Sequence, residues 1–296
     1  MTVYLVCESS SQGLDRRVLE AVVVQLHNLK VLVEATGGMK GHGAVRDYLE
    51  SHSKHDVAIS IQDRDYRLAA TASNTWANPA GKNFIWRKHE IENHLLHPRV
   101  VHEAFQQFRT IGAAWTNSLP ATENDASALL QTLAGPLLEN HAAEVLREEL
   151  VRKINVTGSL SFGPPRPAPP AGSQMRGQAQ WVPALQMEAS RLCQTCRDVA
   201  ALPELQPPAI SPRYHVHLAQ FQDPAFLSSG DYLVDMEGKG LLAALTTYLG
   251  SLGAPARLNQ HALADELLKA LGQIYQPKLI FHPDDFDELA AILKQY

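Results

Sequence analysis

Residues 57–65 read VAISIQDRD, a short apolar run that ends in two carboxylates one residue apart. Small and β-branched apolar residues in such a run predict a buried strand of a parallel sheet. Ligands of open α/β sheets bind outside the carboxyl ends of the strands, which is where Asp63 and Asp65 stand. Because side-chain alternation relaxes as the chain leaves a strand, both carboxylates can turn toward one hard cation such as Mg²⁺. The alternative is a strand-ending turn, which aspartate also favours.

Strand and helix patterns alternate around this strand through the first hundred residues. Residues 36–43 hold four glycines, which let backbone approach a ligand closely. A strand–helix–strand order implies right-handed crossovers and parallel strands. We therefore predict an α/β fold, in which a Rossmann-like parallel sheet is flanked by helices. Expected strands cover residues 3–7, 30–35, 57–61 and 83–86, and expected helices cover 14–29 and 44–51.

Glu8 follows the first expected strand directly. The predicted topology brings it to the same edge of the sheet as Asp63 and Asp65. Three carboxylates within a few ångströms oppose joint ionisation, and a divalent metal resolves that conflict. The other interpretation of Glu8 is an exposed carboxylate near the N-terminus of the next helix, where the helix dipole favours it.

Several of these segments together resemble the Toprim domain, the metal-binding module of topoisomerases, primases and overcoming-lysogenization-defect (OLD) nucleases. They are Glu8, the glycine-rich turn 36–43 and DRDY at 63–66. Residues 86–96, WRKHEIENHLL, are similar to the "IENYLL" segment of the Toprim-like DUF4435 family, and residues 236–242, MEGKGLL, resemble a GK-(D/E)-LL turn late in those nuclease domains. The resemblance covers roughly residues 3–98 and implies a Toprim-like fold with a mainly helical insertion.

One departure from the family concerns the turn after the first strand. Toprim domains usually have Glu-Gly there, with an acidic residue about four positions further on, whereas Glu8 is followed by SSSQGLD over residues 9–15. Asp15 either replaces the second acidic position or charges the first turn of the helix, and we favour the second interpretation.

The chemistry that the resemblance implies is metal-assisted phosphodiester hydrolysis, with Mg²⁺ or Mn²⁺ as cofactor. Asp63 and Asp65 are expected to hold the metal, and Glu8 to complete its shell or act as general base. Glu92 is expected to hold a second cation, and Lys239 to stabilise charge on the scissile phosphate. The alternatives are a solvated surface for Glu90 and Glu92, and a helix-opening cation for Lys239.

The resemblance also implies partners. Toprim effectors of the PARIS anti-phage defence system belong to the same family context: an ABC-type ATPase partner holds them until a phage protein releases them, and they cleave tRNA as dimers. We therefore expect a homodimeric nuclease that cleaves tRNA in preference to DNA. The sequence has no GxxxxGK(S/T) motif, so any ATP dependence comes from another protein. If dimerisation builds a local basic groove for nucleic acid, its expected residues are Arg64, Arg67, Lys82, Arg87 and Lys88, whose alternative explanation is a solvated surface.

Composition sets limits on the class of protein. Net charge is −5 with a sequence pI near 6.2, so any contact with nucleic acid must be local. There are three cysteines, too few for a disulfide framework. No apolar stretch of about 18 residues and no basic leader is visible, so we expect a cytoplasmic protein without a membrane span.

The rest of the chain predicts accessory helices. We expect a metal-binding core over residues 1–110, a helical insertion over 111–228 with a proline-rich loop at 158–180, and a return to the core over 229–296. Cys193 and Cys196 have zinc-ligand spacing, and His215 and His217 are the candidate further ligands. Alternating histidines in residues 213–218 favour the polar face of a strand over a zinc site.

Two other functions fit the same sequence. One is a non-catalytic regulatory subunit that binds an ATPase. The other is a different Mg²⁺-dependent phosphoryl-transfer enzyme of the receiver kind, in which Asp63 is phosphorylated. The segment EIEN at residues 90–93 favours the nuclease over both.

Overall fold

The structure is a computed structural model that describes residues 2–8, 12–37, 42–52, 56–65, 83–157, 190–191, 193–275 and 284–296. The chain divides into two compact units, one formed by residues 1–138 and 223–296 and the other by 139–222. The second unit is shorter than the insertion expected over 111–228, because α6 (Glu123–Ala134) packs against helices of the first unit. Five sequence features lie outside the described residues: residues 38–41 of the glycine-rich turn, Tyr66 of the DRDY motif, Arg67, Lys82 and the proline-rich loop 158–180.

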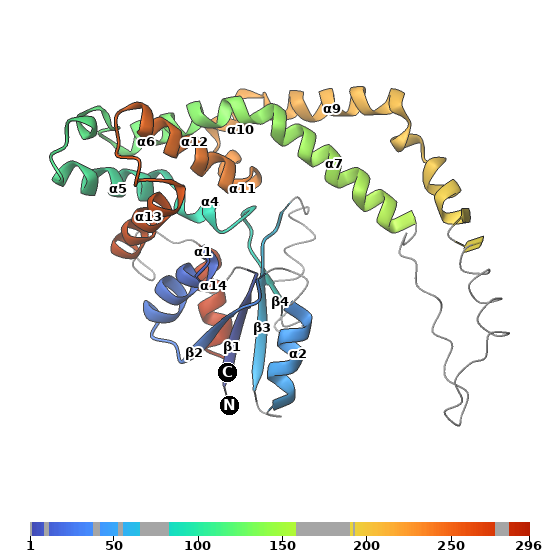
Figure 1. The fold of residues 1–296 in the computed structure, drawn as a ribbon, viewed down its shortest axis with the longest axis horizontal. Helices are drawn as coiled ribbons and strands as arrows, with labels where there is room; N and C mark the ends of the chain where they lie inside the picture. Colours follow the sequence, from blue (N-terminus) through green and yellow to red (C-terminus); the bar gives the residue numbers. More distant parts are fainter. Residues whose placement is uncertain are drawn as a thin grey trace. The chain divides into compact units, whose positions relative to one another are not determined.

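The first unit contains a parallel sheet of four strands in the order β2-β1-β3-β4 (Figure 1). The strands are β1 (Val3–Cys7), β2 (Val31–Ala35), β3 (Val57–Gln62) and β4 (Asn83–Ile85). Val3 pairs with both Val31 and Val57, which makes β1 a central strand, and the strand order makes β3 the other. The buried apolar residues of these two strands are Val3, Leu5, Val6, Cys7, Ala58, Ile59 and Ile61. The predicted α/β fold with a parallel sheet is confirmed.

Helices cover both faces of this sheet. The connection from β1 to β2 is α1 (Leu14–Val18) continued by the π-helix η1 (Leu19–Gln25), and the connection from β2 to β3 is α2 (His42–His52). Because β2 and β3 lie on opposite sides of β1, right-handed crossovers place these helices on opposite faces, as Figure 1 shows. α14 (Asp284–Leu293) packs against η1. The direction of strand order reverses between β1 and β3, which makes the carboxyl ends of these two strands the expected ligand site.

The remaining helices of the first unit pack on one another beyond that edge. α13 (Gln260–Ile274) packs against α5 (Pro98–Thr110) and α12 (Gly238–Ser251). The buried faces of these helices include Phe105, Leu245 and Leu267. α5 starts with a proline, which suits the first helical position, and α6 starts with a capping box between Thr122 and Asp125. The bounds are α4 (Glu92–Leu95), α5 (Pro98–Thr110), η4 (Ala114–Ser118), η5 (Gly135–Leu137), α10 (Pro224–Ser228), α11 (Tyr232–Asp235), α12 (Gly238–Ser251) and α13 (Gln260–Ile274).

The second unit is helical where it is described. It contains most of α7 (Leu138–Thr157), the short η6 (Pro203–Leu205) and α9 (Pro207–Phe221). The strand expected over residues 213–218 is wrong, because these residues belong to α9. Pro207 opens this helix, and Arg213 and His217, four residues apart, both contact Glu149 of α7, at 2.9 and 3.1 Å.

Cys193 and Cys196 are exposed and make no disulfide. Among the described residues, no cluster of three His, Cys, Asp or Glu side chains is placed to hold zinc. None of the described helices is both long enough and apolar enough to cross a lipid bilayer.

Candidate active site

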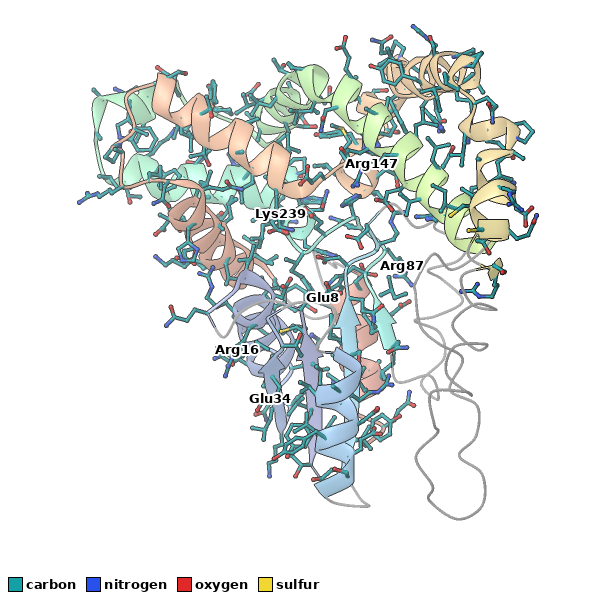
Figure 2. The ribbon with its side chains drawn as sticks, turned by 45° about the vertical axis from the view of Figure 1, so that its right-hand side comes forward. Glu8, Arg16, Glu34, Arg87, Arg147 and Lys239 are labelled. Atoms are coloured by element: carbon teal, nitrogen blue, oxygen red, sulfur yellow. The ribbon has the colours of Figure 1, made fainter. Side chains whose placement is uncertain are left out.

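Glu8 and Asp63 each follow one of the two central strands directly. Val6 pairs with Ser60 in the parallel register, so both carboxylates leave the sheet at the same edge, where strand order reverses. Figure 2 shows Glu8 at this end of the sheet, with Lys239 beyond it. The predicted edge for ligand binding is therefore occupied by acidic residues from neighbouring strands.

The turn after Asp63 is fixed by contacts with a distant segment. Arg64 is buried, and its Nη2 donates to the carbonyl of Val234 at 2.8 Å and to Asp235 Oδ1 at 2.5 Å. Asp65 has a positive φ of 49°, and its N–H donates to the carbonyl of His89 at 3.0 Å. The expectation that Arg64 forms part of an exposed basic groove is wrong, because its guanidinium group holds α11 against the strand end.

The segment over residues 86–96 is buried rather than solvated. Glu90 is 6% exposed and Glu92 is 7% exposed, so the solvated-surface interpretation of these two residues does not hold. Asn93 is fully buried: its Oδ1 accepts from the N–H of Glu90 at 3.0 Å, and its Nδ2 donates to the carbonyls of Leu233 and Met236 at 3.1 and 2.9 Å. Asn93 thereby joins the two acidic residues to the chain that leads into α12.

Gly238 opens α12 against that asparagine. A Cβ atom at this position would lie 2.6 Å from Asn93 Oδ1 and 2.9 Å from Glu92 Cβ, so only glycine allows the approach. Lys239 follows in the first turn. Its Nζ lies 2.7 Å from Glu90 Oε1 and 4.0 Å from Glu92 Oε1, and its backbone N–H donates to Glu90 Oε2 at 3.1 Å. The structure thus brings Lys239 and Glu92 together.

The acidic residues of this region form one electrostatic group, which we call the carboxylate cluster: Asp15, Asp63, Glu90 and Glu92. Burial, and then the charges of Asp15, Glu90 and Glu92, raise the pKa of Asp63 well above its usual value, against the opposing charge of Lys239. Burial also raises the pKa of Glu92 to about 7, and Glu90 and Asp15 add to this rise. Burial opposes the charge of Lys239, yet Glu92, Glu90 and Asp63 together raise its pKa.

Asp15 has a second role in the carboxylate cluster that its position in the sequence does not predict. It lies in the first turn of α1, as the favoured interpretation required, but its charge also acts on Asp63 and Glu92. The sequence patterns do not mark Asn93 and Gly238 as site residues either. The signal for both was the motif similarity at residues 86–96 and 236–242, which does not reveal that the two segments touch.

The cluster has the donor chemistry that a hard divalent cation requires. Glu92 Oε2 is buried and accepts no hydrogen bond from any described residue, so it needs a proton or a cation. Carboxylate oxygens are the preferred ligands of Mg²⁺ and Mn²⁺. Over the described ranges no three acidic, His or Cys side chains already form a metal-binding group. Glu8, Asp63 and Asp65, the predicted metal ligands, share the sheet edge without forming such a group.

A cleft of about 550 Å³ opens beside Glu92 and Lys239. Arg17 of α1 and His261 of α13 line this cleft. Arg17 Nη2 lies 3.5 Å from His261 Nδ1, and Arg17 also forms an ion pair with Asp265. A phosphate-bearing ligand in this cleft would meet cationic side chains next to the carboxylate cluster. Its other lining residues are Gln12, Gly13, Leu14, Leu242, Gln260 and Ala264.

Two further cations of the expected basic groove are already engaged. Arg87 pairs with Asp285, at 3.4 Å, and with Glu288. Lys88 Nζ donates to the carbonyl of Asn93 at 3.2 Å. Lys88 therefore stabilises the backbone of the segment that carries Glu90 and Glu92, and Arg87 connects that segment to α14.

Comparison of the chain with protein-family models, with curated proteins and with solved structures gave no match. Since a fold alone hosts many activities, the chemistry of the carboxylate cluster and its cleft has to indicate the function.

Proposed function

We propose that this chain is a divalent-metal-dependent nuclease that hydrolyses phosphodiesters of nucleic acid at the carboxylate cluster. One observation carries the proposal: Asp63, Glu90 and Glu92 converge with Lys239 at the reversal point of a parallel sheet, beside a cleft that can admit a phosphate. Acidic residues crowded to the point of raised pKa values are costly for a fold to keep, and a bound cation relieves that cost.

Asp63 would hold Mg²⁺ or Mn²⁺ together with Glu8 and Asp65, which share its edge of the sheet. Since these three carboxylates do not already form a metal-binding group, they would have to turn toward the cation when it binds. When bound, the metal supplies polarisation of a phosphoryl oxygen and lowers the pKa of a water molecule. Glu92, with a pKa of about 7, can take up and release a proton near neutral pH, so it suits the role of proton acceptor for the attacking water. It can also contribute its buried Oε2 to a cation.

Lys239 would bind the scissile phosphate. Its side chain is about half exposed, at 51%, and it lines the cleft, so its ammonium group can reach a phosphate oxygen while Glu90 restrains it. The charge that develops on the phosphoryl oxygens during displacement is then met by a cation fixed in place. Glu90 acts through Lys239 and is a positioning residue.

The finer parts of the proposal come from the Toprim-like resemblance of residues 3–98. A carboxylate after β1 and Asp-x-Asp after β3, on neighbouring strands, fit the order in which that resemblance requires them. We accordingly propose a Toprim-like nuclease of the DUF4435 kind: a cytoplasmic, homodimeric anti-phage effector that cleaves tRNA in preference to DNA and is held inactive by an ABC-type ATPase partner.

The test is incubation of the purified protein with a mixture of tRNA and plasmid DNA, with Mg²⁺, with Mn²⁺ or with a chelator. Asp63→Asn and Glu92→Gln should lose metal-dependent cutting. Asp198→Asn and Glu123→Gln, which make the same changes at exposed positions, should cut as the wild type does.

Two results would overturn the nuclease proposal. Absence of cutting even with an ATPase partner and a phage trigger present would favour a regulatory subunit. Transfer of phosphate from a small donor to Asp63 would favour receiver-like chemistry instead.

A further inference from the structure

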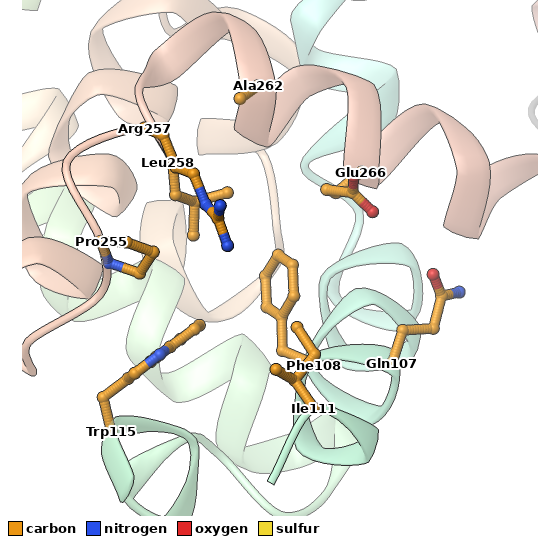
Figure 3. Close-up of a pocket in the computed structure, with 9 residues that line it drawn as sticks. All are labelled: Gln107, Phe108, Ile111, Trp115, Pro255, Arg257, Leu258, Ala262 and Glu266. Carbon is orange, nitrogen blue, oxygen red and sulfur yellow. The ribbon is translucent and has the colours of Figure 1, made fainter. Parts of the chain in front are cut away.

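A second cavity, of about 460 Å³, lies in the first unit along α13 (Figure 3). It is lined by Ala262 and Glu266, whereas the cleft beside the carboxylate cluster is lined by Gln260, His261 and Ala264. At 3.6 residues per turn these two sets project from opposite faces of the helix. The cavity and the cleft therefore flank the N-terminal half of α13, and a ligand that passes over this helix end can reach both.

Aromatic and apolar side chains form most of the cavity. Phe108 of α5 and Trp115 of η4 lie with ring centroids 5.6 Å apart and an interplanar angle of 56°. Ile111, also in the lining, is 67% exposed, which is unusual for a large apolar side chain. The volume falls within the range of about 300–1,000 Å³ typical of small-molecule sites. The cavity thus offers an aromatic wall to a flat ring that comes from solvent.

Its polar groups are placed asymmetrically. Figure 3 shows Arg257 on the same side as Trp115 and Pro255, and Glu266 and Gln107 on the other. Arg257 is exposed and has no ion pair within the part of the chain that the structure describes. The charge of Glu266 is offset by Lys269, whose Nζ lies 2.6 Å from Glu266 Oε1. The cavity therefore combines an aromatic wall with one available cation at its mouth.

We propose that this cavity binds an unpaired nucleobase of the nucleic acid that is cleaved at the carboxylate cluster, an inference that rests on the proposed nuclease function. Trp115, which is half-buried, supplies the stacking surface, with the buried Phe108 packed against it, and Arg257 binds the phosphate attached to that nucleotide. Stacking on aromatic residues combined with cationic contacts to the backbone is how single-stranded nucleic acid is commonly held. The strand then runs over the N-terminal end of α13, from the cavity to the cleft.

The nucleic acid is favoured over a peptide partner by the charge at the mouth and by the position of the cavity. An apolar peptide side chain would need the aromatic wall alone, and it would have no use for Arg257. A strand that already lies in the cleft, by contrast, presents bases and phosphates within reach of the other face of α13.

The test is the affinity of the whole protein for a fluorescently labelled, unstructured RNA oligonucleotide, measured by anisotropy in a chelator, so that cleavage plays no part. Trp115→Leu should raise the Kd about tenfold, the usual effect of removing one stacked aromatic residue. Arg257→Ala, an exposed change that leaves the packing intact, should also raise the Kd. The matched controls are Tyr48→Leu on α2, an aromatic residue that is 62% exposed, and Arg197→Ala; both should bind as the wild type does.

The inference is overturned if both cavity variants bind RNA like the wild type while their melting curves show an intact fold. It is also overturned if they bind RNA normally but fail to bind an added ATPase partner, since the cavity would then be a protein-docking site. Loss of cutting in Glu92→Gln with unchanged RNA affinity would support cleavage at the carboxylate cluster, separately from the binding that the two cavity variants test. Cavity-dependent RNA binding without any cutting by the wild type would reject the nuclease alone.

Discussion

Lys239 binds both carboxylate oxygens of Glu90, with its Nζ 2.7 Å from Oε1 and its backbone N–H 3.1 Å from Oε2. The two residues are 149 positions apart, so this pair joins the early and late segments of the first unit. Glu90 is buried and Lys239 is half exposed. The ammonium group thus serves as the cation of the carboxylate cluster and leaves room on its solvent side for a phosphate.

Lys239→Met should therefore destabilise the fold as well as abolish cutting. It leaves Glu90 buried without its counter-charge, at a cost of about 2 kcal/mol, less than for a fully buried pair because Lys239 is half exposed. Added Mg²⁺ should recover part of this loss, because a divalent cation can replace the ammonium charge. Urea unfolding with and without Mg²⁺ measures both effects.

A suitable control is Lys269→Met, which removes an exposed ion pair with Glu266 of similar length, 2.6 Å. It should change stability by less than about 1 kcal/mol, with no response to Mg²⁺. Equal losses in the two variants would contradict the counter-cation role of Lys239.

The raised pKa of Glu92 predicts how metal binding depends on pH. Its value of about 7 lies above the usual 4.5, so the folded protein holds this carboxyl protonated below neutral pH. A cation binds only the ionised form, and its affinity should therefore rise as pH increases from 6 to 8. Isothermal titration with Mg²⁺ across this range should show the rise in the wild type and a flatter, weaker response in Glu92→Gln. A wild-type affinity that is constant from pH 6 to 8 would contradict the proposal that Glu92 binds the cation.

A different carboxyl, Asp285, should control stability as a function of pH. It is buried, and its Oδ2 accepts from the backbone N–H of Arg87 at 2.9 Å, while His94 Nε2 lies 3.4 Å away. Burial raises its pKa to about 6 from 3.8, against the opposing hydrogen bond and charge of Arg87.

The sign of this effect follows from the proton balance. The folded form binds the Asp285 proton more tightly than the unfolded form does. Protonation of Asp285 therefore contributes ~3 kcal/mol to the free energy of unfolding below about pH 4, and this contribution is lost as pH rises through 6. In Asp285→Asn this loss should be absent, so the variant gains stability relative to the wild type between pH 4 and 7. Urea unfolding at several pH values measures the difference, with the exposed Asp198→Asn as the control that should show no such trend.

The sheet was predictable because its signals are local. The apolar runs predict the bounds of β1 and β3 to within one residue. Because these strands are parallel neighbours, the carboxylates that follow them lie at the same edge of the sheet. The burial of Arg64 and Glu90 was not predictable, since their partners Asp235 and Lys239 come 171 and 149 residues later. A polar stretch such as residues 87–90 is typical of a surface until those partners are known. The expected strand at 213–218 failed for a related reason: contacts with α7 override a two-residue alternation.

Gly238→Ala tests the contact between the two segments of the site most directly. The new Cβ would lie 2.6 Å from Asn93 Oδ1 and 2.9 Å from the Asn93 backbone nitrogen, so either α12 or α4 must move. We expect a loss of about 1–3 kcal/mol in the free energy of unfolding, together with reduced cutting, because the displacement moves Lys239 relative to Glu90 and Glu92. Gly250→Ala lies in the same helix, and no atom of the described residues lies within 4 Å of the added Cβ. It should stabilise the protein by about 0.5–1 kcal/mol without changing activity. If the two substitutions shift the unfolding midpoint in the same direction, the close approach of α12 to Asn93 is not what holds Lys239 in the site.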